Sequence, residues 1–202
     1  MFSRQGLLQI WKETRGYFVF ACILFFASMF VGGSSDAPVG WMNGQLEEID
    51  KLRQSAEGTD SPERAMFFLI IGKNLLASVM AIGFGIIGAI MPIAVLVSNG
   101  MLMGYVLTLV GQTDQNVWLT IVKGLLPHGV LELCAVFLAC AFGIRFGLTF
   151  IRGIGRSLTG KSEPWQPFVR TAIGVVPGIA AIIALLLLAA AVESTITYWL
   201  MT

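Results

Sequence analysis

The apolar run from Ala65 to Val110 constrains the fold of this chain more than any other feature of its sequence. Its main polar interruptions are Lys73, Asn74, Ser98 and Asn99. A helix crosses the hydrocarbon core of a membrane with about 20 apolar residues, so this run is about twice the length that one span needs. We therefore predict two spans here, with a turn in the glycine- and proline-containing segment 88–92.

The composition excludes a soluble domain. The 202 residues are 56% hydrophobic and only 12% charged, whereas an ordinary soluble domain carries roughly a quarter charged residues. The formal net charge of +1 is too small to attract nucleic acid. Cys22, Cys134 and Cys140 lie inside apolar runs, where a thiol behaves as a small hydrophobic group, so no disulfide framework is indicated.

Three further apolar segments complete the predicted fold. They are Tyr17–Val31, Val117–Phe142 and Thr171–Leu200, the last with a kink at Pro177. Residues 1–16 place apolar and basic side chains as an interfacial helix does. A secretory signal is the alternative, but no A-x-A cleavage pattern follows the first run. We predict one all-α domain over residues 1–202, a polytopic bundle of about five transmembrane spans plus an N-terminal interfacial helix.

Charge predicts the orientation. Segment 33–64, an expected extracytoplasmic loop, holds seven acidic and three basic residues, and Ser61-Pro62-Glu63 at its end is a helix start signal. Segment 145–170, an expected connector, holds five basic residues and one acidic residue. Positive segments stay in the cytoplasm. Five spans in a bacterial cytoplasmic membrane then place the N-terminus inside and the C-terminus outside.

The sharpest polar motif is PHGVLEL at 127–133, which puts His128 and Glu132 on one helical face inside the fourth span. Polar groups at this depth are costly and are functional candidates by default. Three hypotheses stay open: a structural hydrogen bond, a proton or ion relay, and a metal site with Glu193. Zinc prefers three or four protein ligands, and His128 is the only histidine. Asn74 and Asn99 are expected to bond inward.

The cations near the spans are interpreted more simply. Lys73, Lys123 and Arg145 are expected to extend toward the interfaces or, for Lys73, to pair with an acid. The connector mixes aromatic, aliphatic and basic residues, a pattern typical of a segment on the anionic inner leaflet. Binding of a cytoplasmic partner is the alternative.

Small residues recur at helical spacing, which in lipid lets helix backbones approach closely. These predicted packing residues include Gly100, Gly104, Gly129, Ala135, Ala139 and Gly143. Packing within the chain and a homodimer face both explain them. The sequence contains no G-x-S-x-G, P-loop, G-x-G-x-x-G or CxxC motif. We therefore expect neither enzyme activity nor a cofactor, although an intramembrane hydrolase would not need these motifs.

Four segments together resemble the stage II sporulation protein M family. They are KN at 73–74, SNGMLMG at 98–104, LLPHGVLELCAVFLACAFGIRFG at 125–147 and AVEST at 191–195. The resemblance implies five spans with the N-terminus inside. It also points to a set of polar and glycine positions: Asn74, Asn99, Gly100, His128, Gly129, Glu132 and Glu193. The family often has two successive asparagines where this chain has Lys73-Asn74.

The resemblance also implies a role. The namesake of the family acts with a peptidoglycan hydrolase and a second membrane protein in engulfment during sporulation, and many relatives occur outside sporulation. We therefore expect a non-enzymatic membrane component that organises or anchors a cell-envelope complex, with the lipid bilayer, envelope proteins and a second copy as partners. The alternative is a transporter or permease subunit with a midplane ion or substrate site.

Overall fold

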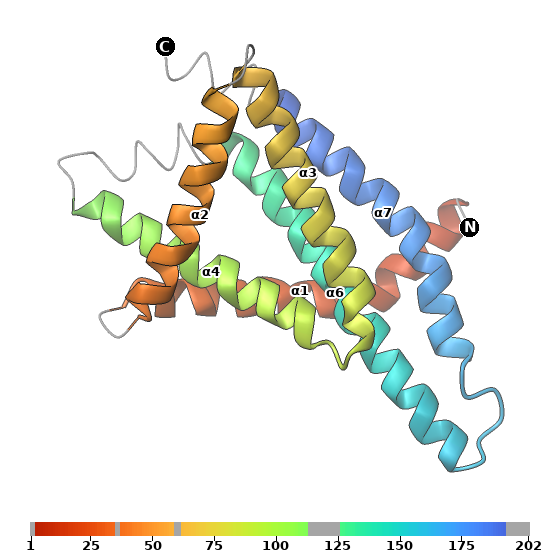
Figure 1. The fold of residues 1–202 in the computed structure, drawn as a ribbon. Coiled ribbons are helices and arrows are strands. Elements are labelled where there is room, and N and C mark those ends of the chain that lie inside the picture. The colour runs from red at the N-terminus through yellow and green to blue at the C-terminus, as the bar shows by residue number, and fades with distance from the viewer. Residues whose placement is uncertain (1–2, 35–36, 59–61, 113–125, 193–202) are drawn as a thin grey trace.

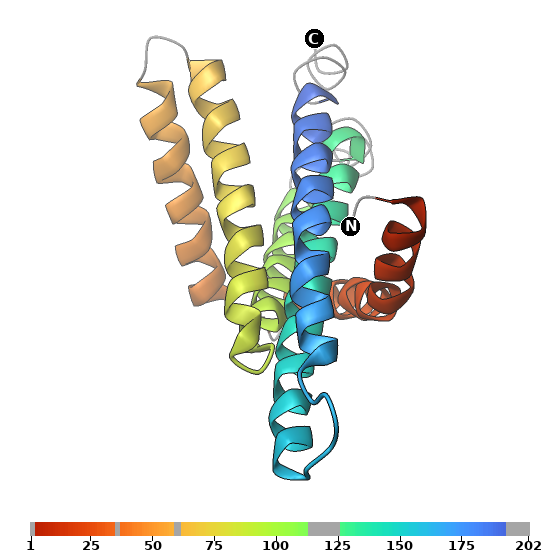
Figure 2. The same cartoon turned by 90° about the vertical axis from the view of Figure 1, so that its right-hand side faces the viewer.

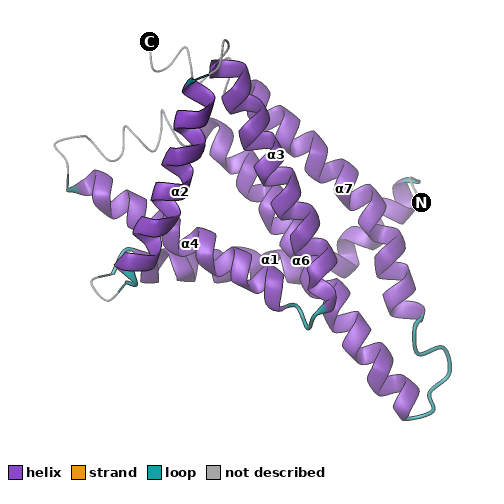
Figure 3. Ribbon diagram, in the orientation of Figure 1, coloured by secondary structure: helices purple, strands orange, loops and turns teal. Residues whose placement is uncertain are grey.

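The computed structural model describes residues 3–34, 37–58, 62–112 and 126–192 (Figures 1 and 3). The helices are α1 (Arg4–Gly32), α2 (Val39–Glu57), α3 (Pro62–Gly83), the 3-10 turn η1 (Phe84–Ile86), α4 (Ile90–Gly111), α6 (Leu126–Leu158) and α7 (Gln166–Val192). Five of them are long and apolar enough to cross a membrane, and these described ranges contain no strand. The predicted all-α bundle of five spans is confirmed.

Helix α6 is the central element of the bundle. It contacts α1, α3, α4 and α7, and 61% of its most apolar stretch is buried, whereas the other four spans do not exceed 33%. Figure 1 shows α3 and α7 running beside α6, while α1 and α4 cross this group. The apolar side chains of α6 therefore face protein on most sides, and those of the other spans largely face the space that lipid would fill.

The α1–α4 crossing depends on glycine. A Cβ atom on Gly32 would overlap the carbonyl oxygen of Met101, and one on Gly104 would overlap the carbonyl oxygen of Met29. A Cβ atom on Gly100 would lie 2.5 Å from the Phe25 carbonyl oxygen. These small residues, two of them predicted as packing positions, lie where the two backbones touch.

A second close crossing joins the end of α3 to α6. Cβ atoms on Gly85 and Gly143 would overlap backbone oxygens of Gly143 and Ala81, respectively. The chain then turns back through Gly88 and Ala89, both with φ of +65°. The predicted turn is therefore present, although it ends at Ala89 and α4 already begins at Ile90. Ala89 accepts a left-handed backbone that costs an L-residue roughly 1–2 kcal/mol, and it is buried.

Two apolar clusters fill the spaces between the crossings. Phe25 of α1, Leu96 of α4 and Phe137 of α6 lie in the first, where the two phenyl rings meet edge-on with centroids 5.2 Å apart. Phe142 of α6 and Ile182 of α7 lie in the second. Together the clusters pack α1, α4 and α7 against α6, and α3 joins them through Ala81 and Ile82.

The acidic segment 33–64 contains a helix that the sequence analysis did not predict. Helix α2 occupies residues Val39–Glu57 and contacts α3 and α4. Met42 is fully buried, and the Tyr105 hydroxyl of α4 donates a hydrogen bond to Asn43 Oδ1 at 2.7 Å. Figure 2 shows α2 beside α3 at the edge of the molecule. This helix depends on contacts with distant residues, which explains why local polarity predicted only a loop.

The basic connector is much shorter than predicted. Helix α6 continues to Leu158 and α7 already begins at Gln166, so most of segment 145–170 is helical. The interface helix expected over residues 1–16 and the first span form one helix from Arg4 to Gly32, and Figure 2 shows its first part turned away from the rest. The interfacial position of that part stays a prediction.

Candidate functional site

The predicted polar site is centred on a contact between α3 and α6. Asn74 Nδ2 donates a hydrogen bond to Glu132 Oε1 at 3.3 Å, and both side chains are half-buried. These residues are 58 positions apart in the chain. An amide that meets a carboxylate in this way satisfies one of its donors without water. The contact therefore joins two of the five residues predicted to form the intramembrane site.

A cavity of about 200 Å³ opens beside this contact, between α2, α3, α4 and α6. Asn74 and Asn99 both line it, so the structure brings these two predicted residues to one site. The polar side chains that complete its wall were not predicted as site residues: Gln45, Lys73, Ser78 and Ser98. Their combination offers amide, hydroxyl and ammonium groups to a small polar guest.

The hydroxyls and the second amide of this cavity are tied to their own helices. Ser78 Oγ donates to the Asn74 carbonyl oxygen at 2.7 Å, and Asn99 Nδ2 donates to the Val95 carbonyl oxygen at 2.7 Å. Such bonds from a side chain to the carbonyl four residues earlier satisfy polar groups inside a helix that lacks water. Asn99 was expected to bond inward. Its amide bonds to a carbonyl of its own helix, and its side chain stays exposed on the cavity wall.

The remaining predicted residues stay untested. His128 lies in the first turn of α6, but its side chain is outside the described part of the structure, and Glu193 lies outside the described residues altogether. Among the side chains that are described, no three of the histidine, cysteine or acidic type come close enough to hold a metal ion. The relay, metal and structural hypotheses for the His128 and Glu132 pair therefore remain predictions.

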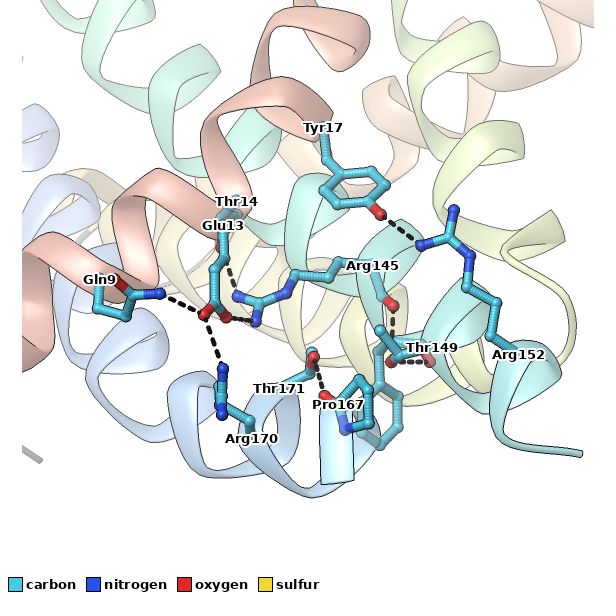
Figure 4. Close-up of polar contacts among 11 residues, drawn as sticks. Gln9, Glu13, Thr14, Tyr17, Arg145, Thr149, Arg152, Pro167, Arg170 and Thr171 are labelled. Atoms are coloured by element: carbon cyan, nitrogen blue, oxygen red, sulfur yellow. Dashed lines mark hydrogen bonds and ion pairs between the residues drawn. The ribbon is translucent and has the colours of Figure 1, made fainter. Parts of the chain in front are cut away.

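A second polar cluster, shown in Figure 4, was missed by the sequence analysis. Arg145 was expected to extend toward a helix end, and this expectation is wrong: the residue is 5% exposed. Its guanidinium forms an ion pair with Glu13 and donates from Nη1 to Thr14 Oγ1 at 2.9 Å. Arg145 does not extend to water because α1 supplies both partners inside the bundle.

Helix α7 joins the same cluster. Arg170 Nη1 lies 3.4 Å from Glu13 Oε1, and Gln9 Nε2 donates to the same oxygen at 2.7 Å. One carboxylate of α1 thus connects α6 and α7, as Figure 4 shows. One signal in the sequence was available: Glu13 is the only acidic residue in the first span helix, and Arg145 interrupts an otherwise apolar stretch.

A family-wide sequence profile described as Stage II sporulation protein M matches residues 9–198. The chain belongs to the stage II sporulation protein M family. The matched range runs from the first turns of α1 through α7. Within this range the described residues form five helices long and apolar enough to cross a membrane, so this member of the stage II sporulation protein M family is a multi-pass membrane protein.

Searches for similarity to curated proteins and to solved structures gave no match.

Proposed function

We propose that this stage II sporulation protein M family member is a non-enzymatic component of the bacterial cytoplasmic membrane that organises or anchors a cell-envelope complex. The observation that supports it best is the placement of α2. This helix is attached to α3 and α4 through buried Met42 and the Asn43–Tyr105 hydrogen bond, yet it presents a large outer surface.

The outer surface of α2 combines charge with apolar groups. Glu47 and Glu48 are exposed, and Trp41 and Leu52 are exposed by 44% and 37%. Exposed aromatic and aliphatic side chains beside acidic groups are typical of an interaction surface. The positive-inside rule predicts that this surface faces the cell envelope. A basic segment of an envelope protein complements it in charge.

The close helix crossings also favour an anchoring role. Where backbones touch at Gly32, Gly104 and Gly143, one helix cannot slide past its neighbour without separating from it. A bundle with such crossings holds its surface helix in a constant position, as an anchor requires.

In-cell photo-crosslinking tests the proposal. A photoreactive residue at Trp41 or Leu52 is expected to crosslink one defined envelope protein, and Glu47→Lys together with Glu48→Lys is expected to abolish that crosslink. Leu188 of α7, which is 56% exposed, is the matched control position on a span. Equal crosslinking from Leu188, or a crosslink that survives both charge reversals, contradicts a role for this surface.

The cavity supports transport as a second candidate function. A cavity between helices that holds a few polar side chains among apolar ones is the arrangement that an ion or substrate site requires, and Asn74 and Asn99 both line this one. Proteoliposomes that contain pH or metal-ion reporters test this candidate. Flux that is lost in Asn74→Ala and Glu132→Gln, with folding retained by size-exclusion chromatography, favours transport. A wild type that gives no flux above protein-free vesicles favours the anchor.

A further inference from the structure

The polar cluster around Arg145 borders a cavity that the Glu13–Arg145 ion pair does not fill. The cavity has a volume of about 240 Å³, and Arg145, Arg152 and Arg170 line it together with Glu13 and Tyr17. Three guanidinium groups against one carboxylate leave two positive charges without compensation by an acid of the cavity wall. Such a site favours an anion.

Two of these arginines have donors to spare. Arg152 Nη1 lies 3.4 Å from the Tyr17 hydroxyl, and Arg170 Nη1 lies 3.4 Å from Glu13 Oε1. A guanidinium has five N–H donors, and within the described residues these long contacts are the only side-chain hydrogen bonds of the two groups. Gln166, the first residue of α7, also lines the cavity.

An apolar groove begins where this cavity ends. The groove has a volume of about 380 Å³ and is lined by Gly16, Tyr17, Phe20, Ile144 and Leu148. Tyr17 lines both spaces, so the groove and the arginine cavity adjoin along the contact of α1 with α6. A Cβ atom on Gly16 would meet no atom within 4 Å, which leaves open space above that residue.

Two tryptophans indicate the depth in the membrane of the arginine-lined cavity and of the apolar groove. Trp165 packs against Phe150 and Phe168 beside the start of α7, and Trp11 packs against Phe18 on α1. Both tryptophans are partly exposed, at 37% and 45%. Exposed tryptophans gather at the level of lipid headgroups. The arginine cavity therefore lies near the headgroups, and the groove leads from it along the apolar parts of α1 and α6.

From this geometry we infer that the protein binds one anionic phospholipid at the α1–α6 contact. Its phosphate lies between Arg152 and Arg170, and one acyl chain occupies the groove above Gly16. Arg145 contributes less, because Glu13 already neutralises its charge. The apolar groove distinguishes this occupant from free phosphate, which would use only the arginines.

Native mass spectrometry of the purified full-length chain tests this inference. The probes are phosphatidylglycerol and phosphatidylcholine with identical chains, and inorganic phosphate alone. The wild type is expected to retain one phosphatidylglycerol in preference to phosphatidylcholine. Arg152→Ala and Arg170→Ala are each expected to weaken this binding about fivefold, the usual contribution of one basic residue near a lipid surface.

Two further variants separate the possible sources of the signal. Arg156→Ala removes an exposed charge from the same helix outside the cavity. It is expected to leave binding within about twofold because this side chain does not line the cavity and acts on the phosphate only through attraction screened by solvent. Gly16→Leu fills the groove without a clash at Cβ, and it is expected to reduce lipid binding while all arginines remain. Three results would each overturn the inference. The first is a loss of binding in Arg156→Ala equal to that in Arg152→Ala or Arg170→Ala, and the second is no preference for phosphatidylglycerol. The third is full displacement of the lipid by inorganic phosphate with no effect of Gly16→Leu.

Discussion

The two polar clusters of this bundle solve the problem of polar groups in an apolar protein in different ways. Around Arg145, opposite charges meet in a buried ion pair and a threonine completes the contact. Around Asn74, an amide meets a carboxylate at 3.3 Å beside a cavity. In the first cluster, the Glu13 carboxylate joins α1, α6 and α7, whereas in the second cluster polar side chains line the wall of a cavity. We conclude that the Glu13–Arg145 pair holds the helices together and that a guest at this cluster would use Arg152 and Arg170 instead. At the second cluster, the Asn74–Glu132 pair itself lies beside the cavity that a guest would enter.

The largest effect is expected from Glu13→Ala. This change leaves the guanidinium of Arg145 buried without its counter-ion, which costs about 3 kcal/mol of unfolding free energy. Reversible unfolding in mixed micelles measures the loss. The matched control is Glu47→Ala, which breaks the fully exposed pair with Lys51 and is expected to change nothing measurable. A Glu13→Ala protein as stable as the control would show that the ion pair is not a structural requirement.

A smaller loss is expected where backbones touch. Gly104→Val forces α4 away from the Met29 carbonyl, at a cost of about 2 kcal/mol. Gly72→Ala on α3 is the control, because a Cβ atom there meets no atom within 4 Å; we expect it to be neutral or slightly stabilising. The same unfolding assay compares the two. If Gly104→Val unfolds like the control, α1 and α4 do not pack as closely as described.

The smallest effect is expected at the cavity. Asn74→Ala removes the hydrogen bond to Glu132 and is expected to cost about 1 kcal/mol or less, since water can replace the amide from the cavity. Glu132→Gln, which keeps the size of the side chain, is expected to cost less still. A loss at Asn74 as large as that of Glu13→Ala would assign the cavity residues a structural role like that of the ion pair.

The amino-acid sequence predicted the features that depend on local pattern. Hydropathy predicted five spans, Pro62 marked the start of α3, and Gly88 marked the turn before α4. Each of these signals lies within the element that it specifies. The polar residues Asn74 and Asn99 could also be predicted to matter, because unpaired amides are costly in lipid, and the structure places both on one cavity.

The features that were missed depend on residues far apart in the chain. Arg145 and Glu13 are separated by 132 positions, so nothing near Arg145 showed that a carboxylate would reach it. Helix α2 is fixed by a bond between Asn43 and Tyr105, 62 positions apart. The contact of Asn74 with Glu132 depends in the same way on the packing of α3 against α6.

Double-mutant cycles on the two pairs test the central comparison most directly. One cycle combines Glu13→Ala with Arg145→Met, and the other combines Asn74→Ala with Glu132→Met, which removes the acceptor oxygens. All variants are unfolded reversibly in the same micelles. We expect a coupling energy of about 2 kcal/mol for the ion pair and about 0.6 kcal/mol for the amide–carboxylate pair. Equal coupling energies, or a larger one at Asn74 and Glu132, would contradict the conclusion that the Glu13–Arg145 cluster holds the helices while the cavity remains available.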